Sequence, residues 1–293
     1  MPTLHDELLR TLSADGTLSV RVLSASNLVR EAAYRHATSP AATVALGRVL
    51  MGGLLLASES SPLLRVQLQF RGRGPIGSVM VTADGEGRVR GYATHPDVAT
   101  PLEGPHLGVA AALGLGELRV ERMHPAWKRP YSGIVPIVQG EIAQDLTLYL
   151  LESEQKPSAL ALGIYLGPGG EVEAAGGYLV QALPDIEIPD VRVIEERIHA
   201  NSNPSEQLHA GTSTRELLEQ LLAETGHGPV DVIEPRFECT CDAERVARSA
   251  QLLGEKELRE IIASGETLEV RCSWCAENYH IDPDQLQRDL DRA

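Results

Sequence analysis

Apolar and polar residues alternate over several short stretches of the first 183 residues, a pattern typical of half-buried strands. Strands are predicted at residues 64–70, 117–123, 133–138, 160–166 and 177–182. A hairpin is predicted at residues 76–83 and 88–93, around the turn Asp84-Gly85-Glu86-Gly87. Helices are predicted at residues 39–57 and 141–152. Because strands and helices do not alternate regularly, the pattern favours an α+β domain.

The helix predicted at residues 39–57 begins with Ser39 as its N-cap and Pro40 at its first position. Its apolar run, 41–57, is short for a membrane span and carries Arg48 in the middle. The run is therefore interpreted as a buried core helix.

The chain after residue 235 predicts a small separate domain, residues 236–293. Helices are expected at 243–253 and 256–263, each followed by a glycine, and strands at 267–271 and 279–281. Asp282-Pro283 opens a last helix with a cap and a first-position proline. A domain of this size rarely builds a sufficient apolar core, so a metal ion would help to hold it together.

Charge distinguishes a middle segment, residues 184–235, from the domains on either side of it. This segment holds 3 basic and 11 acidic residues, whereas residues 1–183 hold 15 and 17 and residues 236–293 hold 8 and 13. It contains a long polar run, 199–215, and a capping box, Ser213 with Glu216, that starts a helix expected to end near Gly226. Such a segment has little to bury and repels itself, which predicts a marginally stable, helical linker.

The net charge of −15 argues against nucleic acid or an anionic membrane as principal partners. The N-terminal residues are polar and acidic, without the apolar region of a signal peptide, so a cytoplasmic location is expected. In that compartment, closely clustered cysteines favour a metal site over structural disulfides.

The chain has four cysteines, arranged as two close pairs: Cys239-x-Cys241, then thirty residues, then Cys272-x-x-Cys275. Each pair can supply two thiolates from one tight turn, as a tetrahedral zinc site requires. One Zn²⁺ per chain, held by these four residues, is therefore predicted. A zinc site with only a structural role remains the plainer alternative.

Three weaker sequence motifs are better explained by structural roles than by catalysis or ligand binding. Gly72-x-Gly74-x-x-Gly77 matches a dinucleotide-binding fingerprint, but a hairpin follows it instead of a βαβ unit, so a glycine-rich connection is favoured. Ser153-x-x-Lys156 has the spacing of a serine acylase motif without its other elements. His280 could be a substitute ligand, although four thiolates make a partly exposed histidine the more economical interpretation.

The cysteine spacing resembles the 33 kDa heat-shock chaperonin family, the redox-regulated bacterial holdases. The resemblance rests on the contexts FECTCDAERVARSAQLLG and EVRCSWCAENYHID, on the block RPYSGIVPIVQGEIAQDLTLYLLESEQKPSALALGI, and on SPAATVALGRVL and GGYLVQALPD. It covers essentially the whole chain, although the linker is particularly polar and its helix boundaries stay open.

The resemblance implies a chaperone, not an enzyme, with a client-binding domain at 1–183, a linker at 184–235 and a redox-switch domain at 236–293. It implies that the reduced protein binds zinc and is inactive. Oxidation would form the disulfides Cys239–Cys241 and Cys272–Cys275, release zinc and unfold the C-terminal domain and linker. The protein would then bind unfolding client proteins without ATP, with homodimerisation favoured.

Two other classes stay open at this point. A thiol–disulfide oxidoreductase would use Cys272-Ser273-Trp274-Cys275, but such pairs normally open a helix in a βαβ unit. A zinc-ribbon adaptor for nucleic acid is disfavoured by the 13 acidic and 8 basic residues of residues 236–293.

Overall fold

The computed structural model describes residues 5–59, 61–99, 108–183, 196, 198–223 and 225–290. Its contacts divide the chain into two compact units, Met1–Phe237 and Glu238–Ala293. Both mix helices with largely antiparallel sheets, which confirms the predicted α+β class. The second unit begins within two residues of the predicted domain start. The finer division of the first unit at residue 183 stays a prediction.

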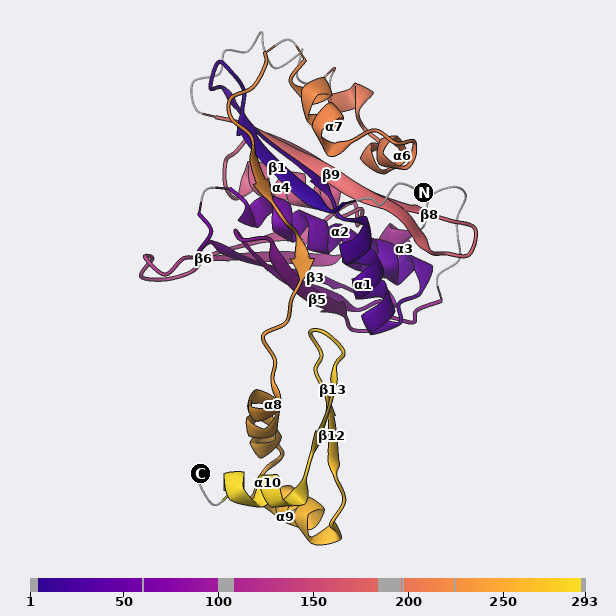
Figure 1. The fold of residues 1–293 in the computed structure, drawn as a ribbon, viewed down its shortest axis with the longest axis vertical. Coiled ribbons are helices and arrows are strands. Elements are labelled where there is room, and N and C mark those ends of the chain that lie inside the picture. Colours follow the sequence, from indigo (N-terminus) through magenta and orange to yellow (C-terminus); the bar gives the residue numbers. More distant parts are fainter. Residues whose placement is uncertain are drawn as a thin grey trace. The chain divides into compact units, whose positions relative to one another are not determined.

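The first sheet of the larger unit has the strand order β10-β1-β2-β9-β8, with every neighbouring pair antiparallel. Its strands are β10 (Asp231–Ile233), β1 (Glu7–Leu12), β2 (Leu18–Ser24), β9 (Val172–Ala182) and β8 (Ser158–Leu166). One face is covered by α6 (Pro204–His209) and α7 (Thr214–Leu221), and the other by helices nearer the N-terminus (Figure 1).

The second sheet has the order β11-β5-β4-β3-β6-β7 and is antiparallel except where β11 pairs with β5. Its strands are β11 (Arg236–Phe237), β5 (Arg88–Ala93), β4 (Ser78–Asp84), β3 (Arg65–Gly72), β6 (Gly116–Met123) and β7 (Tyr131–Ile137). All strands predicted for residues 1–183 are present, with bounds that differ by a residue or two, except that β9 begins earlier, at Val172.

Helix α2 (Pro40–Ala57) forms the core between the two sheets and contacts strands of both. Ser39 caps it as predicted: its side chain accepts a hydrogen bond from the Ala42 amide, and Pro40 occupies the first turn. Gly52 allows close packing, since a Cβ there would lie 2.6 Å from Leu146 of helix α4 (Ala143–Glu152). Among the described residues, α2 alone is long and apolar enough to cross a membrane, but 89% of it is buried inside the fold.

Helix α1 (Ser26–His36) packs beside α2, and the short helix α3 (Val109–Leu113) also contacts it. Asp6 accepts hydrogen bonds from the Asn27 and Leu28 amides and so occupies the beginning of α1. The sequence reading had not predicted α1, α3 or the β1–β2 hairpin.

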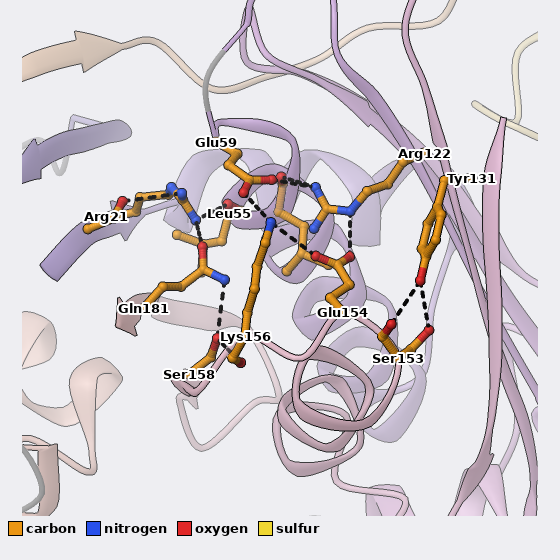
Figure 2. A network of polar contacts seen from close by, with 12 residues as sticks. Arg21, Leu55, Glu59, Arg122, Tyr131, Ser153, Glu154, Lys156, Ser158 and Gln181 are labelled. Carbon is orange, nitrogen blue, oxygen red and sulfur yellow. Dashed lines mark hydrogen bonds and ion pairs between the residues drawn. The ribbon is translucent and has the colours of Figure 1, made fainter. Parts of the chain in front are cut away.

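A partly buried ionic network joins the two sheets close to the end of α2 (Figure 2). Arg122, on β6, contacts Glu59 at 2.8 Å and Glu154 at 2.6 Å. Lys156 also contacts both carboxylates. Burial opposes the charge on Arg122, yet Glu154 and Glu59 raise the pKa of its guanidinium above the ordinary value. Arg122 and Glu154, the two almost fully buried members, therefore each contact opposite charges.

The network continues into the first sheet through Arg21 of β2 (Figure 2). Its guanidinium donates to Gln181 of β9 at 2.7 Å, and the Gln181 amide donates to Ser158 of β8 at 3.1 Å. Burial lowers the pKa of Arg21 to about 10, so this side chain remains charged at neutral pH.

The described part of the linker, residues 196, 198–223 and 225–235, packs against the first sheet; residues 184–195 and 197 lie outside the described residues. The predicted capping box is present: Ser213 Oγ accepts from the Glu216 amide at 3.2 Å, and Glu216 accepts from the Ser213 amide at 2.7 Å. Helix α7 ends at Leu221, earlier than predicted. Its apolar face is buried against β2 and β9, so the linker buries more apolar surface than its polar composition indicated.

The smaller unit contains α8 (Ala243–Ala250), a 3₁₀ turn (Gln251–Leu253), α9 (Glu255–Ser264), the hairpin of β12 (Leu268–Arg271) and β13 (Asn278–Ile281), and α10 (Pro283–Leu290). Every element predicted for residues 236–293 is present, although residues 251–253 continue α8 as a 3₁₀ turn. Among its described residues, partly buried apolar side chains pack around a core of six buried members: Val246, Ala247, Ala250, Leu258, Ile281 and Leu286.

Candidate metal centre

The four cysteines come from two irregular segments of the smaller unit. Cys239 and Cys241 lie in the segment that precedes α8, and Cys272 and Cys275 lie in the turn between β12 and β13. Strand pairing fixes that turn, because Arg271 pairs with Asn278 at the end of the hairpin. The structure therefore brings together residues that the sequence separates by thirty positions.

Backbone geometry places Cys272 and Cys275 on one side of their turn. The Ala276 amide donates to the Cys272 carbonyl at 2.8 Å, and the Cys272 amide donates to the Glu277 carbonyl at 2.9 Å. Ala276 takes a left-handed conformation, φ 59°, which closes the turn directly after Cys275. Two thiols from this turn thus face the pair that precedes α8.

All four Sγ atoms lie within 4.8 Å of one another. Between the two segments, Cys239 Sγ lies 4.0 Å from Cys272 Sγ, and Cys241 Sγ lies 3.3 Å from Cys275 Sγ. Four sulfurs about 2.3 Å from a tetrahedral ion would lie about 3.8 Å apart. The cluster thus has the size of a four-thiolate metal site, and these four residues could hold a metal ion.

None of the four cysteines forms a disulfide in the structure. Each lies close to the other three, so the predicted disulfides Cys239–Cys241 and Cys272–Cys275 remain predictions. Cys275 is buried and the other three are partly exposed, which leaves the cluster accessible from one side.

Burial raises the pKa of the Cys275 thiol and of the Cys241 thiol above the ordinary value. Without a cation, crowded thiols in this position favour the protonated form, because neighbouring thiolates repel each other. A bound divalent cation reverses this preference, since a coordinating thiol loses its proton. The electrostatics therefore suit a site that is completed by a positive ion.

Tyr279 is a further residue of this site that the sequence reading missed. Its hydroxyl donates to Cys241 Sγ at 3.1 Å. That hydrogen bond raises the pKa of the Tyr279 hydroxyl, because the phenol serves as the donor. The ring also packs on the small core of this unit. No spacing in the sequence identifies this contact, since it depends on the register of the hairpin.

The other candidate motifs lie elsewhere or face away. His280 is exposed and outside the four-thiol cluster. Gly72 ends β3 and Gly74 lies in the connection to β4, where a Cβ on Gly74 would lie 2.3 Å from the Ala112 carbonyl oxygen. This is the glycine-rich connection that was favoured over a dinucleotide site. Lys156 belongs to the partly buried ionic network.

A family model described as "Hsp33 protein" matches residues 6–282 of the chain. The chain belongs to the Hsp33 family. This confirms the resemblance identified from the cysteine spacing and the surrounding blocks.

Curated relatives in the Hsp33 family are named 33 kDa chaperonin. The protein of Geobacter sulfurreducens is 39% identical over 289 residues, covering 97% of this chain and 95% of its own. The protein of Thermus thermophilus is 38% identical, covering 96% of this chain and 85% of its own. The crystal structure of the 33 kDa chaperonin from Thermotoga maritima matches with a TM-score of 0.91 at 33% identity, covering 98% of both chains. These names describe a chaperone and not an enzyme.

Proposed function

We propose that this protein is a redox-regulated, ATP-independent chaperone that holds unfolding client proteins after oxidation of its four cysteines. The observation that carries the proposal is the cluster of four thiols, not joined by disulfides and within 4.8 Å of one another, in a small unit with its own core. Family membership supports the chaperone activity, and the thiol cluster supports its regulation.

In the reduced state, Cys239, Cys241, Cys272 and Cys275 would together hold one Zn²⁺, since soft thiolates favour zinc and fill all four positions of a closed site. Structural zinc contributes about 10–16 kcal/mol of apparent binding free energy in small domains. Burial of this small core does little more than offset the conformational entropy that the unit loses on folding. Folding of residues 238–293 and retention of zinc are thus proposed to be one equilibrium.

Oxidation would proceed within Cys239–Cys241 and within Cys272–Cys275. In each pair, one thiolate attacks peroxide, loses two electrons to it and forms a sulfenic acid, which condenses with the neighbouring thiol to a disulfide and water. Each pair consumes one peroxide and yields two waters in all. Cys239 and Cys241 lie in an irregular segment, so a disulfide across the single residue between them is expected to change the local backbone.

The end of the linker connects the switch to the larger unit. Phe237 is buried and packs on α1, with its ring centroid 6.3 Å from His36 and 5.5 Å from the Arg35 guanidinium. Only Glu238 separates Phe237 from Cys239. We therefore propose that unfolding of residues 238–293 pulls on this contact and loosens the acidic linker. The apolar surface exposed in this way would hold clients by burial, and would favour a homodimer.

The deciding experiment compares reduced, zinc-loaded protein with protein treated with peroxide at mild heat, using light scattering from a thermally unfolding client. Suppression of scattering only by the oxidised protein is expected, with recovery of the inactive state after thiol reductant and zinc. Equal suppression by both samples would contradict the redox regulation, and no suppression by either would contradict the chaperone activity.

A thiol–disulfide oxidoreductase is the alternative function, and insulin reduction measured beside the scattering assay distinguishes it. The Cys272–Cys275 turn joins two strands of a hairpin and does not open a helix, so the thiolate gains no helix N-terminus to activate it. Catalytic turnover of insulin is therefore not expected.

Tyr279→Phe is expected to lower zinc affinity about tenfold, because partners of metal ligands typically contribute 10–100-fold. The change removes the donor to Cys241 Sγ but keeps the ring that packs on the core of the unit. A competition titration with a chromophoric chelator measures the change. Tyr165→Phe, on β8 of the larger unit, is the control. Equal affinities of the two variants would show that the hydroxyl does not support the site.

A further inference from the structure

One short segment of the linker covers an edge of both sheets. Strand β10 extends β1 with the pairs Leu8–Ile233, Leu9–Val232 and Arg10–Asp231. After Glu234 and Pro235, β11 pairs with the beginning of β5. The Gly228 amide donates to the Leu12 carbonyl, and the Arg236 amide donates to the Gly87 carbonyl, both at 2.9 Å. Figure 1 shows this segment running along β1.

Strand β10 is held mainly through its backbone. The side chain of Val232 is 60% exposed, Asp231 is exposed, and Ile233 is only partly buried. The ion pair of Asp231 with Arg10, at 2.7 Å, lies at the surface, where such pairs contribute little. A strand with so little side-chain burial can be displaced at low cost in apolar surface.

Strand β1, in contrast, is anchored in the core. Leu8 and Leu9 point to opposite faces of the sheet, and both are fully buried. The other edge of β1 pairs with β2 over six residues. When β10 leaves, β1 therefore stays in place and presents a row of unpaired backbone donors and acceptors.

We propose that, after oxidation, the edge of β1 vacated by β10 captures an extended segment of an unfolded client as an added β-strand, with the edge of β5 vacated by β11 as a second position. The proposal rests on the proposed function, since it requires the linker to loosen. The native strand β10 itself shows that this edge accepts an extended chain.

Strand addition through backbone hydrogen bonds fits a partner without a defined sequence. Backbone amides and carbonyls are common to all unfolded chains, so strand addition provides affinity that hardly depends on side chains. Because the side chains of β10 are mostly exposed, this edge is expected to select little among the side chains of an added strand. A client segment of about six residues would span β1. The same segment, 231–237, would thus cover the capture site in the reduced state.

The test uses amide hydrogen exchange measured by NMR on the full-length protein, because neighbouring amides of β1 point in opposite directions. Leu12 accepts from Gly228, on the β10 side, so by alternation Leu8 and Arg10 also face β10. Leu9 and Thr11 face β2 and are the internal controls. Leu8 and Arg10 should lose protection on oxidation and regain it, at least tenfold, when an unfolded client is added.

Retention of client, seen by light scattering, without renewed protection at Leu8 and Arg10 would overturn this inference and leave the proposed function intact. Protection that never falls on oxidation would overturn it as well. Protection that returns without client, and rises with protein concentration, would assign the edge to a second copy of the chain and overturn the client assignment. Failure to retain client at all would instead contradict the proposed function.

A matched pair of peptides provides a second measurement. Both carry the sequence of residues 229–237, PVDVIEPRF. One is methylated on the backbone nitrogens of Asp231 and Ile233, which face β1, and the other on that of Val232, which faces away. Only the second should displace client from the oxidised protein. Equal behaviour of the two peptides would contradict strand addition.

Discussion

Cys272→Ser is expected to reduce zinc from about one ion per chain to nearly none and to unfold residues 238–293, while the larger unit keeps its fold. A serine hydroxyl remains protonated near neutral pH and is a poor zinc ligand, so the site keeps three thiolates and an open position. The change removes part of the roughly 10–16 kcal/mol that zinc binding supplies to such domains. A core of six buried side chains, two of them alanines, only offsets the entropy cost of folding and so cannot hold the unit folded without zinc.

Zinc content of protein purified without added metal provides the measurement, together with the dispersion of amide resonances from residues 238–290. Ser273→Ala is the matched control, because this exposed side chain lies between the two cysteines of the same turn. A full zinc complement in Cys272→Ser would exclude the four-thiolate site. Loss of zinc with a fully folded smaller unit would instead show that metal and folding are independent.

The helices and strands that the sequence predicted correctly are marked by signals that act over a few neighbouring residues. The cap and first-turn proline of α2, the Ser213–Glu216 capping box and the alternation in β3 to β7 each act within a few residues. In the smaller unit, Gly254 and Gly265 marked the ends of α8 and α9 to within a few residues, and Asp282-Pro283 marked the start of α10. Cysteine spacing likewise identified the cluster before its geometry was known.

The elements that were missed depend on contacts distant in sequence. Strand β2 is buried on both faces, and the burial of Arg21 in particular depends on its contacts with Gln181 of β9 and the end of α2. Strands β10 and β11 are two or three residues long, and β10 pairs with β1 more than two hundred positions away. Only the fold reveals such pairing.

The polar composition of the linker led us to underestimate how much apolar surface it buries. Leu217, Leu218 and Leu221 repeat at helical spacing, and all three are buried against the first sheet. The acidic residues lie on the opposite face of α7, where Glu216 and Glu219 are exposed. A charge count averages over the two faces and therefore underestimates what an amphipathic helix can bury.

Arg122→Met is expected to destabilise the larger unit by about 3–5 kcal/mol, because removal of one partner leaves a buried charge without compensation. Glu154 is almost fully buried, and Arg122 contacts it at 2.6 Å. Lys156 remains, but at 3.3 Å from Glu154 and with a more exposed side chain, it compensates only in part. The substitution also removes the ion pair between Arg122 of β6 and Glu59, which follows α2.

Chemical denaturation of reduced, zinc-loaded protein, followed by far-ultraviolet circular dichroism, measures the effect on the transition of the larger unit. Arg119→Met is the matched control on the same strand, since its contact with Glu121 is 3.8 Å long and exposed and should contribute less than about 1 kcal/mol. Adding Glu154→Gln to Arg122→Met should recover part of the loss, because it removes the uncompensated charge. Equal destabilisation by Arg119→Met and Arg122→Met, without recovery in the double variant, would show that the network does not join the sheets energetically.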